Sequence, residues 1–389
     1  GEGIMFNLID RQNREFGLAP THEEVITFLV SELISSYKHL PVCFYQIQTK
    51  FRDEIRPRFG LMRGREFIMK DGYSFHSNEE DLKNFYKKME NSYKNIFNNC
   101  GLETVGVEAD SGAIGGSSSK EFMITADSGE DKILFTESGS YAANIEKAIS
   151  IPIKGKELSE FDQALINTPN QKSINDICKY ANLDPTQIMK VMIYVGQFDD
   201  KTEVPILLAI RGDQTVNEVK LFNIVNSSHE SNLINIAKLE KESIIERNLK
   251  NLPLGFLGPD LSDEFIREDS KWEKEWLRIA DFSSTNLTSF ISGANKKNYH
   301  KFFDTWQFSE KFINADIRNA KAGDILSKDN NEILIEKKGI EIGHIFQLGQ
   351  KYSERLNAKF SNKKGQLENI WMGCYGIGVT RLAQAAIEQ

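Results

Sequence analysis

Alternating polar and apolar residues mark a hairpin in the first quarter of the chain. Residues 45–54 alternate with a period of two, which is typical of a half-buried β-strand. A basic turn with a proline and a glycine spans residues 56–60, and residues 66–71 predict the returning strand. Because side chains two residues apart on a strand point to the same face, Arg52 and Glu54 should project from one face of the first strand. The same rule groups three residues of the second strand: Phe67, Met69 and Asp71.

Other periodic patterns flank this hairpin. Residues 4–19 predict a shorter hairpin, and an amphipathic helix is expected from about residue 21 to about residue 37. Thr21, with Glu24 three positions later, fits a capping box at the start of that helix. A further amphipathic helix is expected at residues 78–99, with an apolar stripe facing the core: Leu82, Phe85, Tyr86, Met89, Tyr93 and Phe97.

The pattern changes between residues 150 and 312, where lysine, asparagine, aspartate and glutamate dominate. Short helical and strand patterns alternate in this stretch, which is typical of an α/β module. Helices are expected at residues 174–182 and 216–225, and strands at residues 191–195 and 204–210. We therefore predict an α+β chain in which residues 150–312 form an inserted α/β module. Residues 1–149 and 313–389 should form the two parts of one domain.

Composition narrows the class of protein. With 40% hydrophobic and 27% charged residues among 389, the chain resembles ordinary soluble globular proteins. No apolar run reaches the about 18 residues of a membrane span, so no membrane contact is expected. The net charge of −8 counts modestly against a nucleic-acid partner, although an acidic protein can carry a basic patch. Widely spaced cysteines exclude a disulfide framework or a sequence-local zinc site and favour a cytoplasmic location: Cys43, Cys100, Cys178 and Cys374.

Residues 51–76 carry groups suited to a nucleotide. An arginine fork can bind phosphate, a carboxylate can accept from an exocyclic amine, and an aromatic ring can stack on a base. A generic solvated basic hairpin is the alternative, but the ordered string Phe51-Arg52-x-Glu54, then Arg63, Phe67 and Asp71, disfavours it. This string resembles motif 2 of class II aminoacyl-tRNA synthetases. The sequences of residues 56–60 and 69–76 are similar to the corresponding segments of the bacterial-type prolyl-tRNA synthetases.

The C-terminal residues 371–387 predict a strand, a glycine turn and a helix. A Rossmann fingerprint would need Gly-x-Gly-x-x-Gly and an acidic residue about 20 positions later, and the glycines here are spaced differently. Gly376-Ile377-Gly378-x-x-Arg381 instead resembles class II motif 3. The resemblance implies catalytic roles for Arg52, Glu54 and Arg381, and Mg²⁺ binding at Glu341. It also implies an ATP site made of Arg52, Glu54, Arg63, Phe67, Gln347, Gly376, Gly378 and Arg381.

Two further elements resemble the proline-binding parts of this family. Thr21-His22-Glu23 matches a Thr-x-Glu element that holds the amino group of the substrate. The Gly/Ser-rich residues 110–119 lack the Gly-Lys-Ser/Thr of a P-loop and by themselves are typical of a flexible linker. Lys120 stands where the family has a histidine, and His344 either contacts proline or packs. The resemblance implies a proline site made of Thr21, Glu23, Arg52, Gly115, Gly116 and His344.

The inserted module lies where bacterial-type prolyl-tRNA synthetases carry a domain that hydrolyses mischarged alanyl-tRNA. A pocket built for proline cannot exclude alanine sterically, because the lost methylenes are worth only about 1–3 kcal/mol of discrimination. Lys190, by itself a typical surface lysine, matches the essential lysine of that domain. The implied editing residues are Lys190, Gly255, Gly258, Asp281 and His300.

Taken together, the resemblance implies an antiparallel six-stranded class II sheet flanked by helices, with an inserted editing domain. It implies activation of L-proline by ATP and Mg²⁺, transfer to tRNA(Pro), and a homodimer. Motif 1 and the anticodon-binding domain would precede residue 1 and follow residue 389, so we expect a fragment that charges tRNA poorly. A non-catalytic tRNA-binding paralogue and a deacylase acting in trans are the alternatives. Both are disfavoured by the presence of Glu23, Arg52, Glu54, Phe67 and Arg381.

Overall fold

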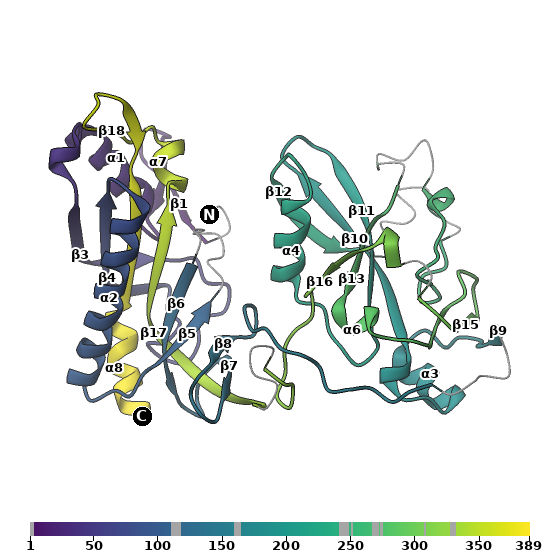
Figure 1. The fold of residues 1–389 in the computed structure, drawn as a ribbon. Coiled ribbons are helices and arrows are strands. Elements are labelled where there is room, and N and C mark those ends of the chain that lie inside the picture. The colour runs from purple at the N-terminus through teal and green to yellow at the C-terminus, as the bar shows by residue number, and fades with distance from the viewer. Residues whose placement is uncertain are drawn as a thin grey trace. The chain divides into compact units, whose positions relative to one another are not determined.

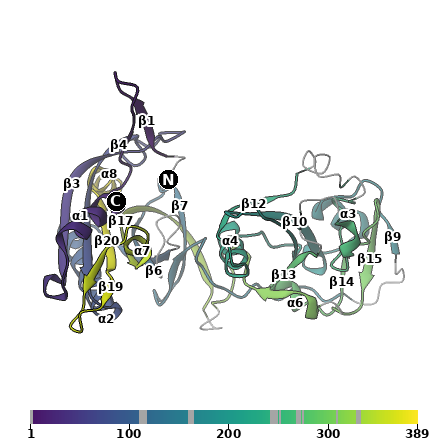
Figure 2. The same cartoon turned by 90° about the horizontal axis from the view of Figure 1, so that it is seen from above.

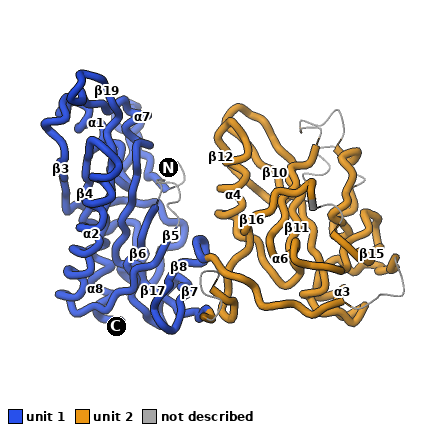
Figure 3. The backbone as a smooth tube through the Cα atoms, viewed as in Figure 1, with its two compact units in different colours: residues 1–148, 334–389 blue, residues 149–333 orange. Residues whose placement is uncertain are grey.

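A computed structural model describes residues 4–109, 118–158, 165–240, 249, 252–266, 272, 275–306, 309–326 and 332–389. The chain divides into two compact units, coloured separately in Figure 3. Unit 1 comprises Gly1–Ala148 and Leu334–Gln389, and unit 2 comprises Ile149–Ile333. None of the helices within the described ranges combines the length and the apolar character needed to cross a membrane.

The end of the inserted unit differs from the predicted boundary at residue 312. Unit 2 continues to Ile333. The physical reason is strand pairing, since β16 (Ile313–Ala315) lies parallel to β13 (Leu277–Asp281) at the edge of the sheet of unit 2.

In the described residues, unit 1 is built on an eight-stranded sheet, shown in Figure 1. Its spatial order is β3-β4-β20-β17-β6-β5-β8-β7, and every neighbouring pair is antiparallel except β5 with β8. The resemblance implied six strands, fewer than the sheet contains. β7 and β8 extend the sheet, and β7 also pairs with the first half of β17. The strands are β3 (Val42–Phe51), β4 (Glu66–His76), β5 (Val105–Ala109), β6 (Ser118–Thr125), β7 (Asp131–Thr136), β8 (Ala142–Asn144), β17 (Leu334–Gly349) and β20 (Trp371–Gly378).

Helices cover both faces of this sheet. On one face, α2 (Glu79–Asn99) and α8 (Val379–Glu388) bury Tyr93, Phe97 and Ala385 against β17 and β20. On the other face, α1 (Glu23–Leu33) and the short α7 (Lys351–Arg355) pack over the strands. The predicted stripe of the helix at residues 78–99 is confirmed, because Phe85 and Met89 also pack against this core.

The start of α1 differs from the capping box predicted at Thr21 and Glu24. His22 is the N-cap residue and makes no side-chain capping hydrogen bond. The Thr21 hydroxyl instead donates to the carboxylate of Glu23. The helix also ends at Leu33, before a separate 3₁₀ turn at Tyr37–His39.

Smaller elements complete unit 1. The hairpin expected at residues 4–19 is confirmed as β1 (Phe6–Ile9) paired with β2 (Glu15–Leu18). Another short antiparallel pair joins β18 (Lys359–Ser361) and β19 (Leu367–Asn369).

The described part of unit 2 contains a five-stranded sheet in the order β12-β10-β11-β13-β16, seen from above in Figure 2. Its first three strands are antiparallel, and its last two add in parallel. A smaller antiparallel sheet joins β14 (Phe290–Gly293), β15 (Tyr299–Phe303) and β9 (Leu165–Asn167). The predicted helices and strands are confirmed with shifted ends as α3 (Ile174–Ala181), α4 (Glu218–Ser227), β10 (Met189–Phe198) and β11 (Glu203–Arg211), and β12 is Leu233–Lys238.

Candidate functional site

A pocket on the sheet of unit 1 gathers side chains from segments far apart in the sequence. It is lined by residues of β4, β17 and β20, by the segment that follows β3, and by the starts of α1 and α8. Most of the residues proposed for ATP and proline line this one pocket: Thr21, Glu23, Arg52, Glu54, Arg63, Phe67, Glu341, His344, Gly376, Gly378 and Arg381. The structure therefore brings together both halves of the predicted site within one unit.

Arg52 and Phe67 form the aromatic and cationic part of the pocket. Arg52 lies one residue past the end of β3, where its main-chain N–H still donates to the carbonyl of Arg65 at 2.8 Å. Its guanidinium carbon lies 5.1 Å from the ring centroid of Phe67. Burial lowers the pKa of Arg52, although Glu341 opposes this shift. A partly desolvated guanidinium beside a ring suits a phosphate next to an aromatic base.

Arg63 connects the turn of the hairpin to the carboxylates around it. Its Nε donates to Glu54 Oε2 at 3.1 Å, and its Nη1 donates to Glu130 Oε2 at 3.3 Å. Glu130 also lies 3.5 Å from the Nε of Arg58. Glu130 was not predicted as a site residue, and 67 positions separate it from Arg63 in the sequence.

Arg381 reaches from α8 to β17. Its Nη1 donates to the main-chain carbonyl of Glu341 at 2.9 Å and to Glu341 Oε2 at 3.0 Å, while its Nε donates to the carbonyl of Met62 at 3.0 Å. These contacts join the last helix to the basic hairpin. The arginine therefore has a fixed position at the edge of the pocket.

Two carboxylates and an imidazole meet beside Arg381. The ligand atoms of Glu121, Glu341 and His344 lie within 4.8 Å of one another, an arrangement that could hold a metal ion. His344 Nδ1 lies 3.1 Å from Glu341 Oε1 and 3.8 Å from Glu121 Oε1. Burial, followed by the charge of Glu341, raises the pKa of Glu121 to about 9. Glu121 was missing from the predicted site residues, since only strand pairing between β6 and β17 brings it opposite His344.

His344 lines the pocket and has one ring nitrogen without a hydrogen-bond partner among the described residues. Its Nε2 is buried and has no hydrogen-bond partner among the described residues. The imidazole ring stacks on Phe346, with centroids 3.8 Å apart and an interplanar angle of 22°. The side chain therefore packs on Phe346 and leaves Nε2 buried.

Glu23 also lines the pocket and is only 2% exposed. The hydroxyl of Thr21 donates to its Oε2, and the Cys374 thiol donates to its Oε1 at 3.3 Å. Burial is the largest cause that raises the pKa of Cys374, so the thiol keeps its proton and remains a donor. The Glu23 carboxylate is thus held from two sides and is available to a cationic group.

A buried ion pair supports this part of the pocket. Lys50, which is fully buried, lies 2.8 Å from Asp71 Oδ1, and its Nζ lies 2.7 Å from His22 Nδ1. Tyr73 donates to Asp71 Oδ2 at 2.8 Å. Asp71 was predicted to share a face with Phe67 and Met69, which is confirmed because all three residues line the pocket. Lys50 was missed as a supporting residue, although it lies two positions before Arg52, so the alternation of the strand places both on one face.

Three predicted residues of this site require separate comment. Gln347 does not line the pocket described here, because strand alternation turns it to the face of Ile345, which packs under α2. His344 and Phe346 occupy the pocket face of the same strand. Gly115 and Gly116 lie outside the described residues.

A second pocket lies in unit 2 and is lined by Lys190, Gly255 and His300. Lys190 Nζ donates to the main-chain carbonyl of Gln214 at 2.7 Å, and burial lowers the pKa of the ammonium group. The imidazole of His300 is hydrogen-bonded through Nδ1 to the hydroxyl of Thr168 at 2.7 Å. Burial lowers the pKa of His300 to about 4, so the ring is neutral near pH 7.

The remaining editing candidates have structural roles in the described chain. Asp281 is the N-cap of the short α6 (Phe282–Thr285), and its carboxylate accepts from the main-chain N–H groups of Ser283 and Ile317 at 2.8 and 2.9 Å. Neither Asp281 nor Gly258 lines the pocket of Lys190. A Cβ at Gly258 would lie 2.3 Å from the carbonyl oxygen of Gly293, so close backbone packing requires glycine there.

The chain is similar to known proteins over nearly its whole length. The family model described as the tRNA synthetase class II core domain (G, H, P, S and T) matches residues 6–389. Proteins named proline–tRNA ligase from Prochlorococcus marinus strains MIT 9515 and NATL2A are 68% and 54% identical over 390 residues. The matches cover 100% of this chain and 65% of each relative, so the chain spans about two thirds of their length.

Solved structures were also compared with the chain. A prolyl-tRNA synthetase from Giardia lamblia in complex with prolyl-adenylate aligns with a TM-score of 0.44 and 11% identity. That alignment covers 100% of this chain and 37% of the other. A prolyl-tRNA synthetase from Cryptosporidium parvum complexed with L-proline and AMP has a TM-score of 0.42 and 10% identity, and the alignment covers 99% of this chain and 37% of that one.

Proposed function

The chain belongs to the tRNA synthetase class II core family, and from this premise we propose that it activates L-proline with ATP as part of a proline–tRNA ligase. The prolyl-adenylate would then pass its acyl group to tRNA(Pro). The names of the relatives support proline as the amino acid. We further propose that the whole protein works in the cytoplasm as a homodimer, as the resemblance of its motifs implies.

One observation carries this proposal. A single pocket holds Arg52 over Phe67 at one part and the buried carboxylate of Glu23 at another. The first pair suits an adenine nucleotide, and the carboxylate suits the secondary ammonium of proline. Both reactants of an amino-acid activation therefore have a chemically matched partner in the same cavity.

The reaction needs no nucleophilic side chain from the protein. A carboxylate oxygen of proline attacks the α-phosphorus of ATP, and the bond to pyrophosphate breaks. Glu23 would hold the ammonium of proline, with Thr21 and Cys374 fixing that carboxylate by hydrogen bonds. Arg52 would neutralise the charge that develops on the α-phosphate. Catalysis then consists of positioning and charge stabilisation.

The nucleotide itself would be held by the remaining residues of the hairpin and the last helix. Phe67 would stack on the adenine, and Glu54 would accept from its exocyclic amine. Arg63 supports this arrangement because it binds the Glu54 carboxylate at 3.1 Å. Arg381 would cover the other side of the adenine and meet the γ-phosphate.

The acidic cluster fits a magnesium ion. Carboxylate oxygens are the ligands that Mg²⁺ prefers in proteins, and Glu121 and Glu341 supply them from neighbouring strands. Burial is the largest cause of the raised pKa of Glu121 and repulsion from Glu341 the next, and a bound cation would relieve that repulsion. When bound, Mg²⁺ would neutralise phosphate charge. Glu341 would be the main ligand of the ion. His344 orients the Glu341 carboxylate, because its Nδ1 lies 3.1 Å from Glu341 Oε1.

We also propose that unit 2 hydrolyses alanyl-tRNA(Pro). Lys190, Gly255 and His300 line one pocket, which supports a site for the mischarged end of the tRNA. The Lys190 ammonium could bind an anionic or carbonyl oxygen, and neutral His300 could accept or donate a hydrogen bond. Asp281 and Gly258 would contribute through the local fold, consistent with their contacts.

Proline-dependent exchange between ATP and labelled pyrophosphate tests the main proposal. We expect exchange with L-proline, about 10–200-fold weaker exchange with L-alanine, and little with glycine. Absence of exchange together with hydrolysis of alanyl-tRNA(Pro) would favour the deacylase. Absence of both activities together with tRNA binding would favour a non-catalytic paralogue.

A further inference from the structure

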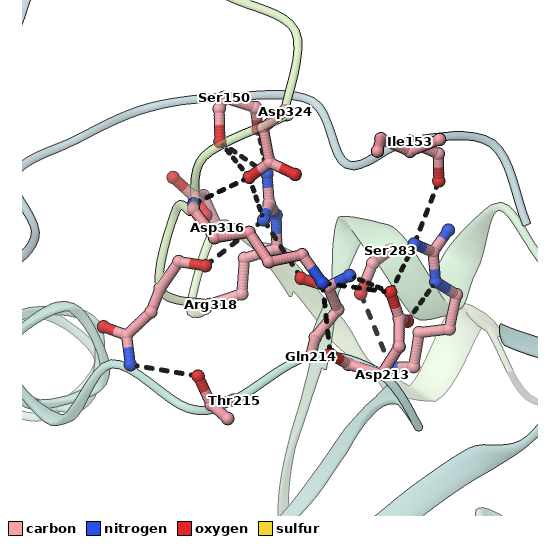
Figure 4. A network of polar contacts seen from close by, with 12 residues as sticks. Ser150, Ile153, Asp213, Gln214, Thr215, Ser283, Asp316, Arg318 and Asp324 are labelled. Carbon is pink, nitrogen blue, oxygen red and sulfur yellow. Dashed lines mark hydrogen bonds and ion pairs between the residues drawn. The ribbon is translucent and has the colours of Figure 1, made fainter. Parts of the chain in front are cut away.

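A network of polar contacts lies where the chain enters and leaves unit 2 (Figure 4). The entering and leaving segments pair with each other, since Ile151 and Ile325 exchange main-chain hydrogen bonds at 2.7 and 2.9 Å. Arg318 lies at the centre of the network and is 2% exposed. The leaving segment also runs antiparallel to the turn after β11, with Asn319 donating to the carbonyl of Thr215 at 2.9 Å. This pairing brings the side chain of Arg318 beside Gln214.

Arg318 joins three segments through its guanidinium group. Nη1 donates to Asp324 Oδ2 at 2.7 Å and to Gln214 Oε1 at 3.0 Å. Nη2 donates to the carbonyl and the hydroxyl of Ser150 at 2.9 and 2.6 Å. Such a buried ion pair is costly to break because it leaves a charge without a partner. The side chain of Arg318 is therefore fixed relative to Gln214.

Gln214 is held at both ends of its amide and is 1% exposed. Its Oε1 accepts from Arg318, and its Nε2 donates to Asp213 Oδ2 at 2.5 Å. Asp213 is itself fixed by Arg211, whose Nε and Nη2 donate to its two carboxylate oxygens at 2.6 and 3.0 Å. The side-chain contacts, together with the hydrogen bond that the Gln214 main-chain N–H donates to the carbonyl of Arg211 at 3.0 Å, restrict the rotation of residue 214 and thereby the direction of its main-chain carbonyl. That carbonyl accepts the hydrogen bond from Lys190 at 2.7 Å.

The Lys190 ammonium donates to a neutral acceptor, the main-chain carbonyl of Gln214, and makes no ion pair with any residue in the described ranges. An ammonium group has three donors, so two remain for a ligand. Burial and the charge of Lys238 lower the pKa of Lys190, while Asp213 opposes that shift. His300 lines the same pocket. A loosely held lysine would lose this geometry, because its side chain has four rotatable bonds.

We propose that Arg318 and Gln214 are positioning residues that fix the direction of the Lys190 ammonium, an inference that rests on the proposed editing function of unit 2. Neither residue need touch the substrate. Arg318 orients the Gln214 amide, and the Gln214 carbonyl orients Lys190. The contacts between the entering and leaving segments of unit 2 thus also orient the lysine in its pocket.

Gln214→Met tests this proposal, because it removes both amide contacts and leaves the Arg318–Asp324 pair intact, while the main-chain carbonyl of residue 214 is still present but loses the side-chain contacts that orient it. We expect kcat for alanyl-tRNA(Pro) hydrolysis to fall at least tenfold with little change in KM. The rate at which an amine-acetylating reagent labels Lys190, followed by mass spectrometry, should rise at least threefold because the ammonium form loses a fixed acceptor. Thr215→Val is the matched control, since it removes only the contact of Thr215 with Asn319 in the same turn.

The outcomes separate the two proposals. Wild-type hydrolysis by Gln214→Met, unchanged labelling of Lys190, or an equal loss in Thr215→Val would overturn the positioning role. If the native protein hydrolyses no alanyl-tRNA(Pro) but Gln214→Met still changes the labelling, the editing function fails and the positioning role stands. Should Gln214→Met not fold, Arg318→Lys provides the same comparison, since it keeps a charge opposite Asp324 and loses the fork that reaches Gln214.

Discussion

Arg381 Nη1 donates to both the main-chain carbonyl and the carboxylate of Glu341, at 2.9 and 3.0 Å. Burial alone would raise the pKa of Glu341, but the hydrogen bond from His344 and the charge of Arg381 lower it to about 2. The carboxylate is therefore ionised throughout the physiological range. Arg381 on the last helix thus helps to keep the Glu341 carboxylate of β17 ionised, which is the form that binds a cation.

Replacement of Arg52 should remove most of the proline-dependent pyrophosphate exchange. Loss of one preorganised group that stabilises transition-state charge costs about 10²–10³-fold in rate. We expect a loss of this size in kcat for Arg52→Ala, because its guanidinium lies over Phe67 in the pocket. Arg14→Ala is the control, since Arg14 is exposed and pairs with Asp10 in a hairpin turn. Full exchange activity in Arg52→Ala would contradict the mechanism.

Glu23→Gln should weaken proline binding more than it affects ATP. The variant keeps the size of the side chain and removes the charge that would meet the ammonium of proline, so KM for proline should rise about tenfold or more. KM for ATP should stay within about twofold. Glu24→Gln, on the exposed side of the same helix turn, should behave like the native protein. Equal effects on both substrates would argue against a proline-specific role.

Glu121 should make the free protein less stable as the pH rises. Its folded pKa of about 9 lies above the ordinary value, so the folded state binds a proton that the unfolded state has already lost. The stabilisation is complete below the ordinary pKa of about 4.3 and is lost as the pH approaches 9. Thermal unfolding of Glu121→Gln without Mg²⁺ should therefore show a smaller decrease in Tm between pH 6 and pH 9. Glu108→Gln, on the adjacent strand and exposed, should keep the native slope.

Lys190→Ala should separate the two units functionally. We expect hydrolysis of alanyl-tRNA(Pro) to fall by at least 100-fold and proline-dependent exchange to remain within about twofold. The reason is that Lys190 lines a pocket formed within unit 2, whereas the exchange reaction uses residues of unit 1. Lys179→Ala, exposed on α3, is the control. Loss of both activities together would mean that Lys190 has a structural role.

Local pattern correctly indicated which side chains share a face of the hairpin. Phe67, Met69 and Asp71 line the pocket as the period of two required. The same pattern failed for the capping box, because the Thr21 hydroxyl donates to Glu23 instead of capping the helix. Sequence reasoning could not decide whether the Thr21 hydroxyl accepts from a main-chain N–H or donates to Glu23, since the choice depends on the buried position of Glu23 beside Cys374.

The sequence by itself determined the two N-terminal hairpins, the amphipathic helix at residues 78–99, the α/β character of the insert and the residue types suited to a nucleotide and an amino acid, because these follow from periodicity and side-chain chemistry. Only the tertiary structure decided which of those residues meet. Strand pairing brings Glu121 opposite His344 and turns Gln347 away from the pocket. The fold likewise made Asp281 a helix cap and tied Lys190 to Gln214. Contacts between residues many positions apart depend on sheet register and on which polar groups become buried together. The local sequence specifies neither the register nor the burial.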